Sequence, residues 1–207
     1  KNNEIFYKEQ EKIYPIMFIS EFRRFEESPH FSAQKKAVSY LKNFCEIKKI
    51  RPQIALNTTR PDKHKYFGRG YKLENEIKFY RENLINFGFN KNSSYEIASK
   101  SNLIICLSSN LGIELLTRGF KVIFLDILGT LDKDWSYPYF SEEIPPFFIK
   151  GINSKNVYEK INFFLNLEDK AWKEMLLKNK NKPLFDEQNK LLKNKIYSII
   201  EKKKYKS

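Results

Sequence analysis

The chain has 207 residues, of which 41% are hydrophobic and 30% are charged, and its formal net charge at pH 7 is +13. This length suits one sizeable α/β domain or two small ones, and the hydrophobic content argues against a disordered chain. No apolar run reaches the roughly 20 residues of a membrane span, and the polar residues 1–14 do not form a secretory signal.

The apolar periodicity predicts strands that alternate with helices. In chain order, the expected elements are strand Ile16–Ser20, helix Ala33–Lys48 with Ser32 as its N-cap, strand Gln53–Asn57, helix Leu73–Phe87, helix Ser94–Ser101, strand Asn102–Leu107, helix Leu111–Thr117, strand Lys121–Leu125, helix Asn153–Leu167, helix Asp169–Leu177 and a last helix at about Phe185–Lys203. We expect loops at 21–31, 58–72 and 127–149, and we expect Arg118-Gly119 to end the helix before it.

Solidly apolar strands that alternate with helices are typical of a parallel sheet covered on both faces. We therefore predict a Rossmann-like α/β domain in residues 1–150. Residues 151–207 are expected to form C-terminal helices that pack on this domain or extend from it.

Much of the positive charge lies in these last helices, where residues 150–207 contain 15 Lys against 7 Asp or Glu. A basic helical tail is usually a solvated surface, although it can also contact anionic lipid headgroups or another polyanion. No RRM, zinc-finger or P-loop signature accompanies the charge, so we expect no nucleic-acid partner.

The segment from Ser94 to Asp126 carries the most specific functional signal. Its first buried strand ends in a turn of small polar residues, Ser108, Ser109 and Asn110, and a helix follows at once. Such a turn directs free backbone N–H groups and the positive end of the helix dipole at one spot, which makes it a natural anion site. The alternative is that these residues are ordinary N-caps, which every α/β protein contains.

Glu114 follows this turn within the first two turns of the helix, between the apolar residues Ile113 and Leu115. A carboxylate that faces a cleft there can accept hydrogen bonds from a ribose diol. The alternative is a solvated Glu that favours the helix dipole.

The same segment resembles the nucleotide-sugar half of GT-B glycosyltransferases, and more narrowly bacterial surface-carbohydrate (O-antigen or capsule) biosynthesis proteins. The residues that match this pattern are Ser108, Ser109, Gly112, Glu114, Gly119 and Lys121. The start, IMFISEF, is similar to the first strand and loop of the C-terminal GT-B domain, and NVYEKINFFLNLEDKAWKEM is similar to its closing helices.

The resemblance implies the donor-binding half of an enzyme. A nucleotide-sugar, with a CMP-sugar as the favoured donor, would bind to this half, and a glycan or lipid-linked acceptor would bind to an N-terminal GT-B domain or a partner chain. The chain begins with Lys rather than Met, which is consistent with a processed or truncated piece of a longer protein, and the resemblance leaves open whether the N-terminal domain belongs to the same protein or to a partner chain. We expect a cytoplasmic protein that can be peripheral to the inner membrane, and no metal or other cofactor, because the helix N-terminus and basic side chains neutralise the leaving phosphate.

Further candidate residues follow the first two predicted strands. Arg60 can grip a phosphate or a sugar carboxylate in a bidentate manner, or it is a surface Arg before a proline turn. His64 and Glu21 are the candidates for a catalytic acid or base, although a lone loop His is more often simply exposed, and Glu21 can pair with Arg23. For Asp126 we expect helix capping.

The remaining residues point to structural roles. The aromatic residues around Trp135 in the 127–149 loop could stack on a base or a sugar, but such residues more often cover the core. Cys45 and Cys106 are expected to be buried thiols of a reducing compartment, and no metal-ligand spacing is present.

Two other functional classes stay open. One is a non-catalytic nucleotide- or polyanion-binding module that reaches the membrane surface through its basic C-terminal helices. The other is an epimerase-like sugar-nucleotide enzyme on a similar sheet. This class would have a GxGxxG turn or a Tyr-x-x-x-Lys pair, but the chain has no GxGxxG, and Tyr137 and Tyr139 lack a Lys four residues on.

Overall fold

The computed structural model describes residues 11–22, 28–57, 73–84, 86–89, 93–131, 145–150 and 153–178. In this part of the chain, six parallel strands form one sheet in the order β3-β2-β1-β4-β5-β6. The strands are β1 (Tyr14–Ile19), β2 (Gln53–Ala55), β3 (Gly88–Phe89), β4 (Ser101–Cys106), β5 (Val122–Leu125) and β6 (Phe148–Ile149). The predicted Rossmann-like α/β class is confirmed.

The strand order reverses between β1 and β4. The chain builds β2 and β3 on one side of β1, and then returns to pair β4 with the other side, so that Met17 lies between Gln53 and Ile104. In an open parallel sheet, ligands bind outside the carboxyl ends of the strands at such a switch point. The residues that follow β1 and β4 therefore mark the place where a site is expected.

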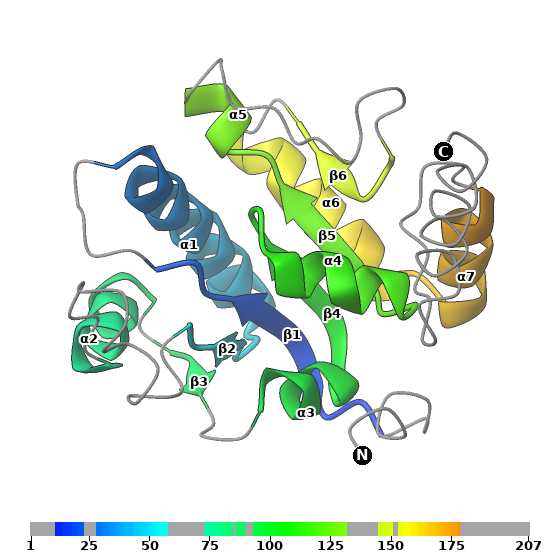
Figure 1. The fold of residues 1–207 in the computed structure, drawn as a ribbon, viewed down its shortest axis with the longest axis horizontal. Helices are drawn as coiled ribbons and strands as arrows, with labels where there is room; N and C mark the ends of the chain where they lie inside the picture. Colours follow the sequence, from blue (N-terminus) through cyan, green and yellow to red (C-terminus); the bar gives the residue numbers. More distant parts are fainter. Residues whose placement is uncertain are drawn as a thin grey trace, which may run out of the picture.

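Helices cover both faces of the sheet (Figure 1). They are α1 (Pro29–Lys48), α2 (Leu73–Asn83), α3 (Ser94–Ser99), α4 (Asn110–Thr117), α5 (Leu128–Leu131), α6 (Ser154–Asn166) and α7 (Asp169–Lys178). Helix α4 lies in front of β4 and β5 in this view, whereas α6 lies behind the sheet beside α1. In parallel sheets, crossovers are almost always right-handed, so connections that leave the central strands in opposite directions place helices on opposite faces.

The central strands form the core because their side chains are apolar on both faces. The last four residues of β1 and all of β5 are buried, and Ile16, Phe18 and Phe124 are completely so. The helix layer behind the sheet is closed by a ring contact between Phe44 of α1 and Tyr158 of α6, with centroids 5.1 Å apart.

Helix α1 begins earlier than predicted. Ser28, rather than Ser32, is its N-cap: the Ser28 hydroxyl accepts a hydrogen bond from the backbone N–H of Phe31 at 3.2 Å, and Pro29 occupies the first helical position. A Ser-Pro pair is a strong helix start, and it outweighs the apolar periodicity that placed the start at Ala33.

Helix α2 ends at Asn83, so the predicted extension of this helix to Phe87 was wrong. The N–H of Gly88 instead donates to the carbonyl of Pro52 at 2.8 Å, which brings the chain into the sheet as β3. The pairing partner lies more than 30 residues away in the sequence, and a two-residue strand has no periodicity of its own.

The segment 127–149, predicted as a loop, contains α5 and β6. Asp126 caps α5, because its Oδ1 accepts a hydrogen bond from the N–H of Gly129 at 3.0 Å, and the predicted capping role is confirmed. β6 pairs with β5 through Phe124 N–H to Phe147 carbonyl (2.9 Å) and Asp126 N–H to Ile149 carbonyl (3.0 Å).

The C-terminal helices α6 and α7 lie close to their predicted positions and pack on the sheet. Val157, Ile161 and Phe164 of α6 are buried, and the indole N–H of Trp172 donates to the carbonyl of Gly119 at 2.9 Å. Gly119 has φ of +89° and ends the α4 segment as predicted. The helix predicted at about 185–203 lies outside the described residues, and the boundary at residue 150 stays a prediction.

Candidate functional site

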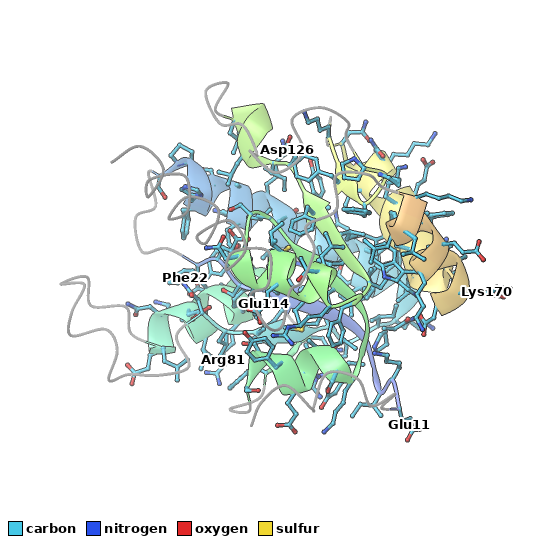
Figure 2. All side chains as sticks on the ribbon, turned by 45° about the vertical axis from the view of Figure 1, so that its right-hand side comes forward. Glu11, Phe22, Arg81, Glu114, Asp126 and Lys170 are labelled. Atoms are coloured by element: carbon cyan, nitrogen blue, oxygen red, sulfur yellow. The ribbon has the colours of Figure 1, made fainter. Side chains whose placement is uncertain are left out.

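The candidate site lies at the switch point, where Ser20 and Glu21 follow β1 and where Leu107 to Ser109 join β4 to α4. Figure 2 labels two landmarks, Phe22, which is the residue after Glu21, and Glu114 on α4. Two chain segments that are far apart in the sequence therefore meet at the edge where parallel sheets bind ligands.

The Glu21 carboxylate joins these two segments. Its Oε1 accepts hydrogen bonds from the backbone N–H groups of Leu107 at 3.0 Å and Ser108 at 2.7 Å, and its Oε2 accepts one from the Ser108 hydroxyl at 2.6 Å. Hydrogen bonds to a carboxylate are short and strong, so they hold the β4–α4 turn against the end of β1. The part of the turn that was predicted to receive an anion thus already contacts an anionic side chain of the protein.

A buried polar network lies behind Glu21. The Ser20 hydroxyl donates to the Glu76 carboxylate, which also accepts the backbone N–H of Asn57 at 2.8 Å. The Gln34 amide donates to the Tyr80 hydroxyl, and its Oε1 accepts the backbone N–H of Glu21 at 3.3 Å. A buried network whose members bond to one another fixes a single arrangement, and here it fixes the end of β1.

This network was missed by the sequence analysis, although the sequence contains a signal for it. Gln34 lies on the face of α1 that also carries Ala37 and Leu41, and Glu76 lies one turn before Tyr80. The side chains of Gln34 and Glu76 are completely buried. A polar residue on an apolar helical face is informative, because burying it without a partner is costly.

Tyr80 is held in its protonated state by this environment. Burial raises its pKa well above the ordinary value of 10.0, and the negative charge of Glu76 acts in the same direction. The phenol therefore remains a neutral hydrogen-bonding group at all physiological pH values.

The predicted anion-binding residues open α4. Ser109 is the N-cap residue by its backbone conformation, with φ of −67° and ψ of 130°, but its side chain makes no capping hydrogen bond. Asn110 is exposed. Gly112 is buried, and a Cβ at this position would lie 2.5 Å from Cys106 Sγ and 3.2 Å from Phe124 Cε1, so its role in the structure is close packing of α4 on the sheet.

Glu114 belongs to a second polar cluster, between α3 and α4. Its Oε2 accepts a hydrogen bond from the Tyr95 hydroxyl at 2.8 Å, and its Oε1 contacts Arg118 Nη2 at 3.0 Å and Nε at 3.3 Å. Burial raises the pKa of Tyr95, and the hydrogen bond to Glu114 raises it further. The Glu114 side chain is 36% exposed, so it remains accessible from outside the cluster.

Arg60 and His64 lie outside the described residues, as does Trp135 with the aromatic residues near it. Among the described residues, no group of three or more His, Cys, Asp or Glu is arranged to hold a metal ion. Cys45 and Cys106 are both free and buried, as predicted.

A comparison with known protein families matches residues 1–199 to a family described as "putative O-antigen biosynthesis protein". The chain belongs to this family. The family description associates the chain with O-antigen biosynthesis, which agrees with part of the resemblance seen in the sequence. No curated protein and no solved structure gives a significant match.

The family description indicates a role in O-antigen biosynthesis for the chain that carries the switch-point site. The described helices of this family member include none with both the length and the apolar character needed to cross a bilayer.

Proposed function

We propose that the chain is the donor-binding domain of a GT-B type glycosyltransferase, which takes a sugar from a nucleotide-activated donor during O-antigen biosynthesis. The observation that carries this proposal is the Ser108–Asn110 turn, which opens α4 at the switch point of a Rossmann-like sheet in a chain of an O-antigen family. The same arrangement binds phosphates in other α/β proteins.

The proposal assigns a role to each candidate residue. The Ser109 hydroxyl, which makes no capping bond, and the first N–H groups of α4 hold the phosphate of the donor. Glu114 accepts hydrogen bonds from the ribose, and Arg60 binds an anionic group of the donor or of the leaving nucleotide. The helix N-terminus supplies the positive potential that a metal ion supplies in other transferases.

Catalysis requires groups beyond this site. His64 is the candidate for an acid or base, because imidazole titrates near neutral pH. Glu21 is less suited to proton transfer than the sequence implied, because its carboxylate accepts three hydrogen bonds from the β4–α4 turn. The acceptor, a glycan or a lipid-linked glycan, would bind to an N-terminal domain or a partner chain. If the acceptor is lipid-linked, the transfer would take place at the inner membrane.

Nucleotide binding is the direct test. We expect one of CMP, CDP, UDP, GDP or ADP to raise the melting temperature without magnesium, because a ligand that binds only the folded state stabilises it. The Ser109→Ala and Glu114→Ala variants should each weaken this binding about tenfold or more, as expected for loss of a hydrogen bond to a charged group or within a polar site. Ser154→Ala, at the exposed first residue of α6, is the matched control and should bind as wild type does.

Equal binding by wild type and both site variants would contradict the assignment of the site. Binding of heparin or of anionic vesicles, with no response to any nucleotide, would favour the non-catalytic polyanion-binding alternative. In that case, deleting residues 202–207 should abolish the binding, since they include four of the Lys residues of the basic tail.

A further inference from the structure

Two hollows lie along the boundary between α1 and α2, outside the switch-point site. The first, of about 430 Å³, is lined by residues of both helices and by Phe22, which is labelled in Figure 2 and follows Glu21. The second, of about 390 Å³, is lined by the C-terminal part of α1 and by residues just after α2. Asn83 lines the first hollow and Leu84 the second, so the two follow one another along the same helix pair. Each has the volume of a typical ligand site.

We propose that these two hollows, together called the α1–α2 groove, bind a saccharide chain that carries negative charges. The described residues that line the groove do not include those that the proposed function assigns to the nucleotide, so the two sites are independent. The proposed function places the glycan on another domain or a partner chain, whereas the groove would let this chain itself hold one.

Four lysines give the groove its positive charge. Lys35 of α1 and Lys78 of α2 line the first hollow, and Lys42 and Lys49 line the second. Lys35, Lys42 and Lys49 are seven residues apart, so they follow one another along α1 and its C-cap at intervals of about 10 Å. This row of cations suits an extended ligand that carries more than one negative charge.

The two acidic residues that line the groove offset this charge only in part. The Glu82 side chain lies 3.8 Å from Lys78 Nζ and is 60% exposed. The Glu46 side chain lies 4.0 Å from Lys42 Nζ and is 57% exposed. Ion pairs this long and this exposed are weak, so both lysines can still bind another anion. Lys35 makes no ion pair with the acidic residues that the structure describes.

The floor of the first hollow is an aromatic cluster with little free surface. The rings of Phe22, Phe31 and Phe79 contact one another, with centroids 5.2 to 6.2 Å apart. Phe22 and Phe79 are only 5% and 6% exposed. An acyl chain gains affinity from a broad apolar surface, and nucleic-acid bases need open ring faces on which to stack. Because these rings offer neither, the hollow favours a polar ligand.

The polar groups of the groove suit a ligand with hydroxyl groups. Asn75 and Asn83 line the first hollow, and Asn86 lines the second. An amide side chain has both donors and an acceptor, so it can pair with a hydroxyl group in either direction, whereas a lysine can only donate. Amides beside lysines therefore match hydroxyl groups combined with anionic groups, which is the chemistry of an acidic saccharide. Membership of an O-antigen biosynthesis family supports the same ligand class.

The test measures the binding of a tetrasaccharide of galacturonic acid by titration calorimetry. The groove variant carries Lys35→Gln and Lys78→Gln, which remove one cation from each helix at the first hollow. The control variant carries Lys155→Gln and Lys160→Gln, at exposed positions of α6, and changes the net charge equally. Two further probes, the carboxyl-reduced tetrasaccharide and a tetraglutamate peptide, separate the recognition of hydroxyl groups from that of charge.

We expect wild type to bind the acidic tetrasaccharide more tightly than either further probe, because only this probe combines hydroxyl groups with several negative charges. The groove variant should bind it about tenfold less tightly, and the control variant should bind it as wild type does. Asn75→Ala removes a partner for hydroxyl groups but no charge. It should weaken the binding of the acidic tetrasaccharide and leave that of tetraglutamate unchanged.

Absence of tetrasaccharide binding to wild type, or equal losses in the groove and control variants, would overturn the proposal. Tetraglutamate binding as tight as that of the tetrasaccharide would overturn the saccharide specificity. Binding of phosphatidylglycerol vesicles that the groove variant loses, without saccharide binding to wild type, would overturn it in favour of a lipid surface. The groove variant should bind nucleotides as wild type does, so failure of this proposal and failure of the proposed function are distinguishable.

Discussion

At position 112, a hydrogen atom is the largest side chain that fits between α4 and the sheet. A Cβ built there lies 2.5 Å from Cys106 Sγ and 3.2 Å from Phe124 Cε1, and both of these side chains are completely buried. The backbone of α4 can therefore approach β4 and β5 closely only because residue 112 is glycine.

We predict that Gly112→Ala lowers the free energy of unfolding by about 1–3 kcal/mol, as expected for an overpacked interior. The gain in helix propensity of Ala over Gly, about 1 kcal/mol, opposes this and is smaller than a clash with buried atoms. Urea denaturation followed by circular dichroism would measure the difference.

A second substitution tests the cause. Cys106→Ala removes the sulfur that the new methyl group would meet, so the double variant should lose less stability than the two single variants together predict. Strict additivity of the two effects would show that the close approach at Cys106 is not the source of the loss.

The sequence predicted which residues belong to the candidate site better than it predicted which of them contact one another. Ser108, Ser109 and Glu21 were all predicted as candidate residues, and each of them follows a predicted apolar strand. The hydrogen bonds between Glu21 and Ser108 join residues 87 positions apart, and they depend on β1 and β4 being neighbours. The sequence contains no local signal for that pairing.

At the level of elements, length decides what can be predicted. Helices and strands with several apolar residues in register, such as α1 and β4, were found within a few residues of their observed ends. β3 and β6 have two residues each and α5 has four. The two strands form because a neighbouring strand pairs with each of them, and α5 forms with a capping hydrogen bond to Asp126. Segments this short are too short for apolar periodicity to predict them.

The junction of α6 and α7 depends on a buried lysine, Lys121, just before β5. Its Nζ donates to the carbonyl of Leu167 at 2.5 Å and to Asn102 Oδ1 at 3.3 Å, and it pairs with Asp169 at 3.3 Å. The Lys121 side chain is 4% exposed. One cation thus attaches the turn between the last two described helices to the amino edge of the sheet.

We predict that Lys121→Met lowers the free energy of unfolding by about 1–3 kcal/mol, because the carbonyl of Leu167 and the amide of Asn102 lose their donor inside the protein. Methionine keeps most of the side-chain volume, so packing changes little. Lys173→Met, at an exposed position of α7, is the control and should stay within about 0.5 kcal/mol of wild type in urea denaturation. Equal stabilities of the two variants would contradict the role of Lys121.

At the scale of the whole molecule, two buried thiols link folding to pH. Burial raises the pKa of Cys45 from 9.0 to about 12, and the charge of Glu46 adds to this shift. Burial also raises the pKa of Cys106 well above 9.0. Above the ordinary thiol pKa, the unfolded chain releases these protons while the folded protein retains them, so alkaline pH favours unfolding.

The sign and size of this effect follow from proton linkage. Each thiol should lower the free energy of unfolding by about 1.4 kcal/mol per pH unit once the pH exceeds the unfolded pKa, and for Cys45 this continues to about pH 12. We therefore predict that the unfolding free energy of wild type, measured by urea denaturation in reductant, falls more steeply between pH 8 and pH 10 than that of the variant with both Cys45→Ala and Cys106→Ala. The two alanines reduce stability at every pH through lost packing, but only the thiols change how steeply the unfolding free energy falls with pH. Equal slopes in wild type and variant would mean that the buried cysteines do not titrate on unfolding.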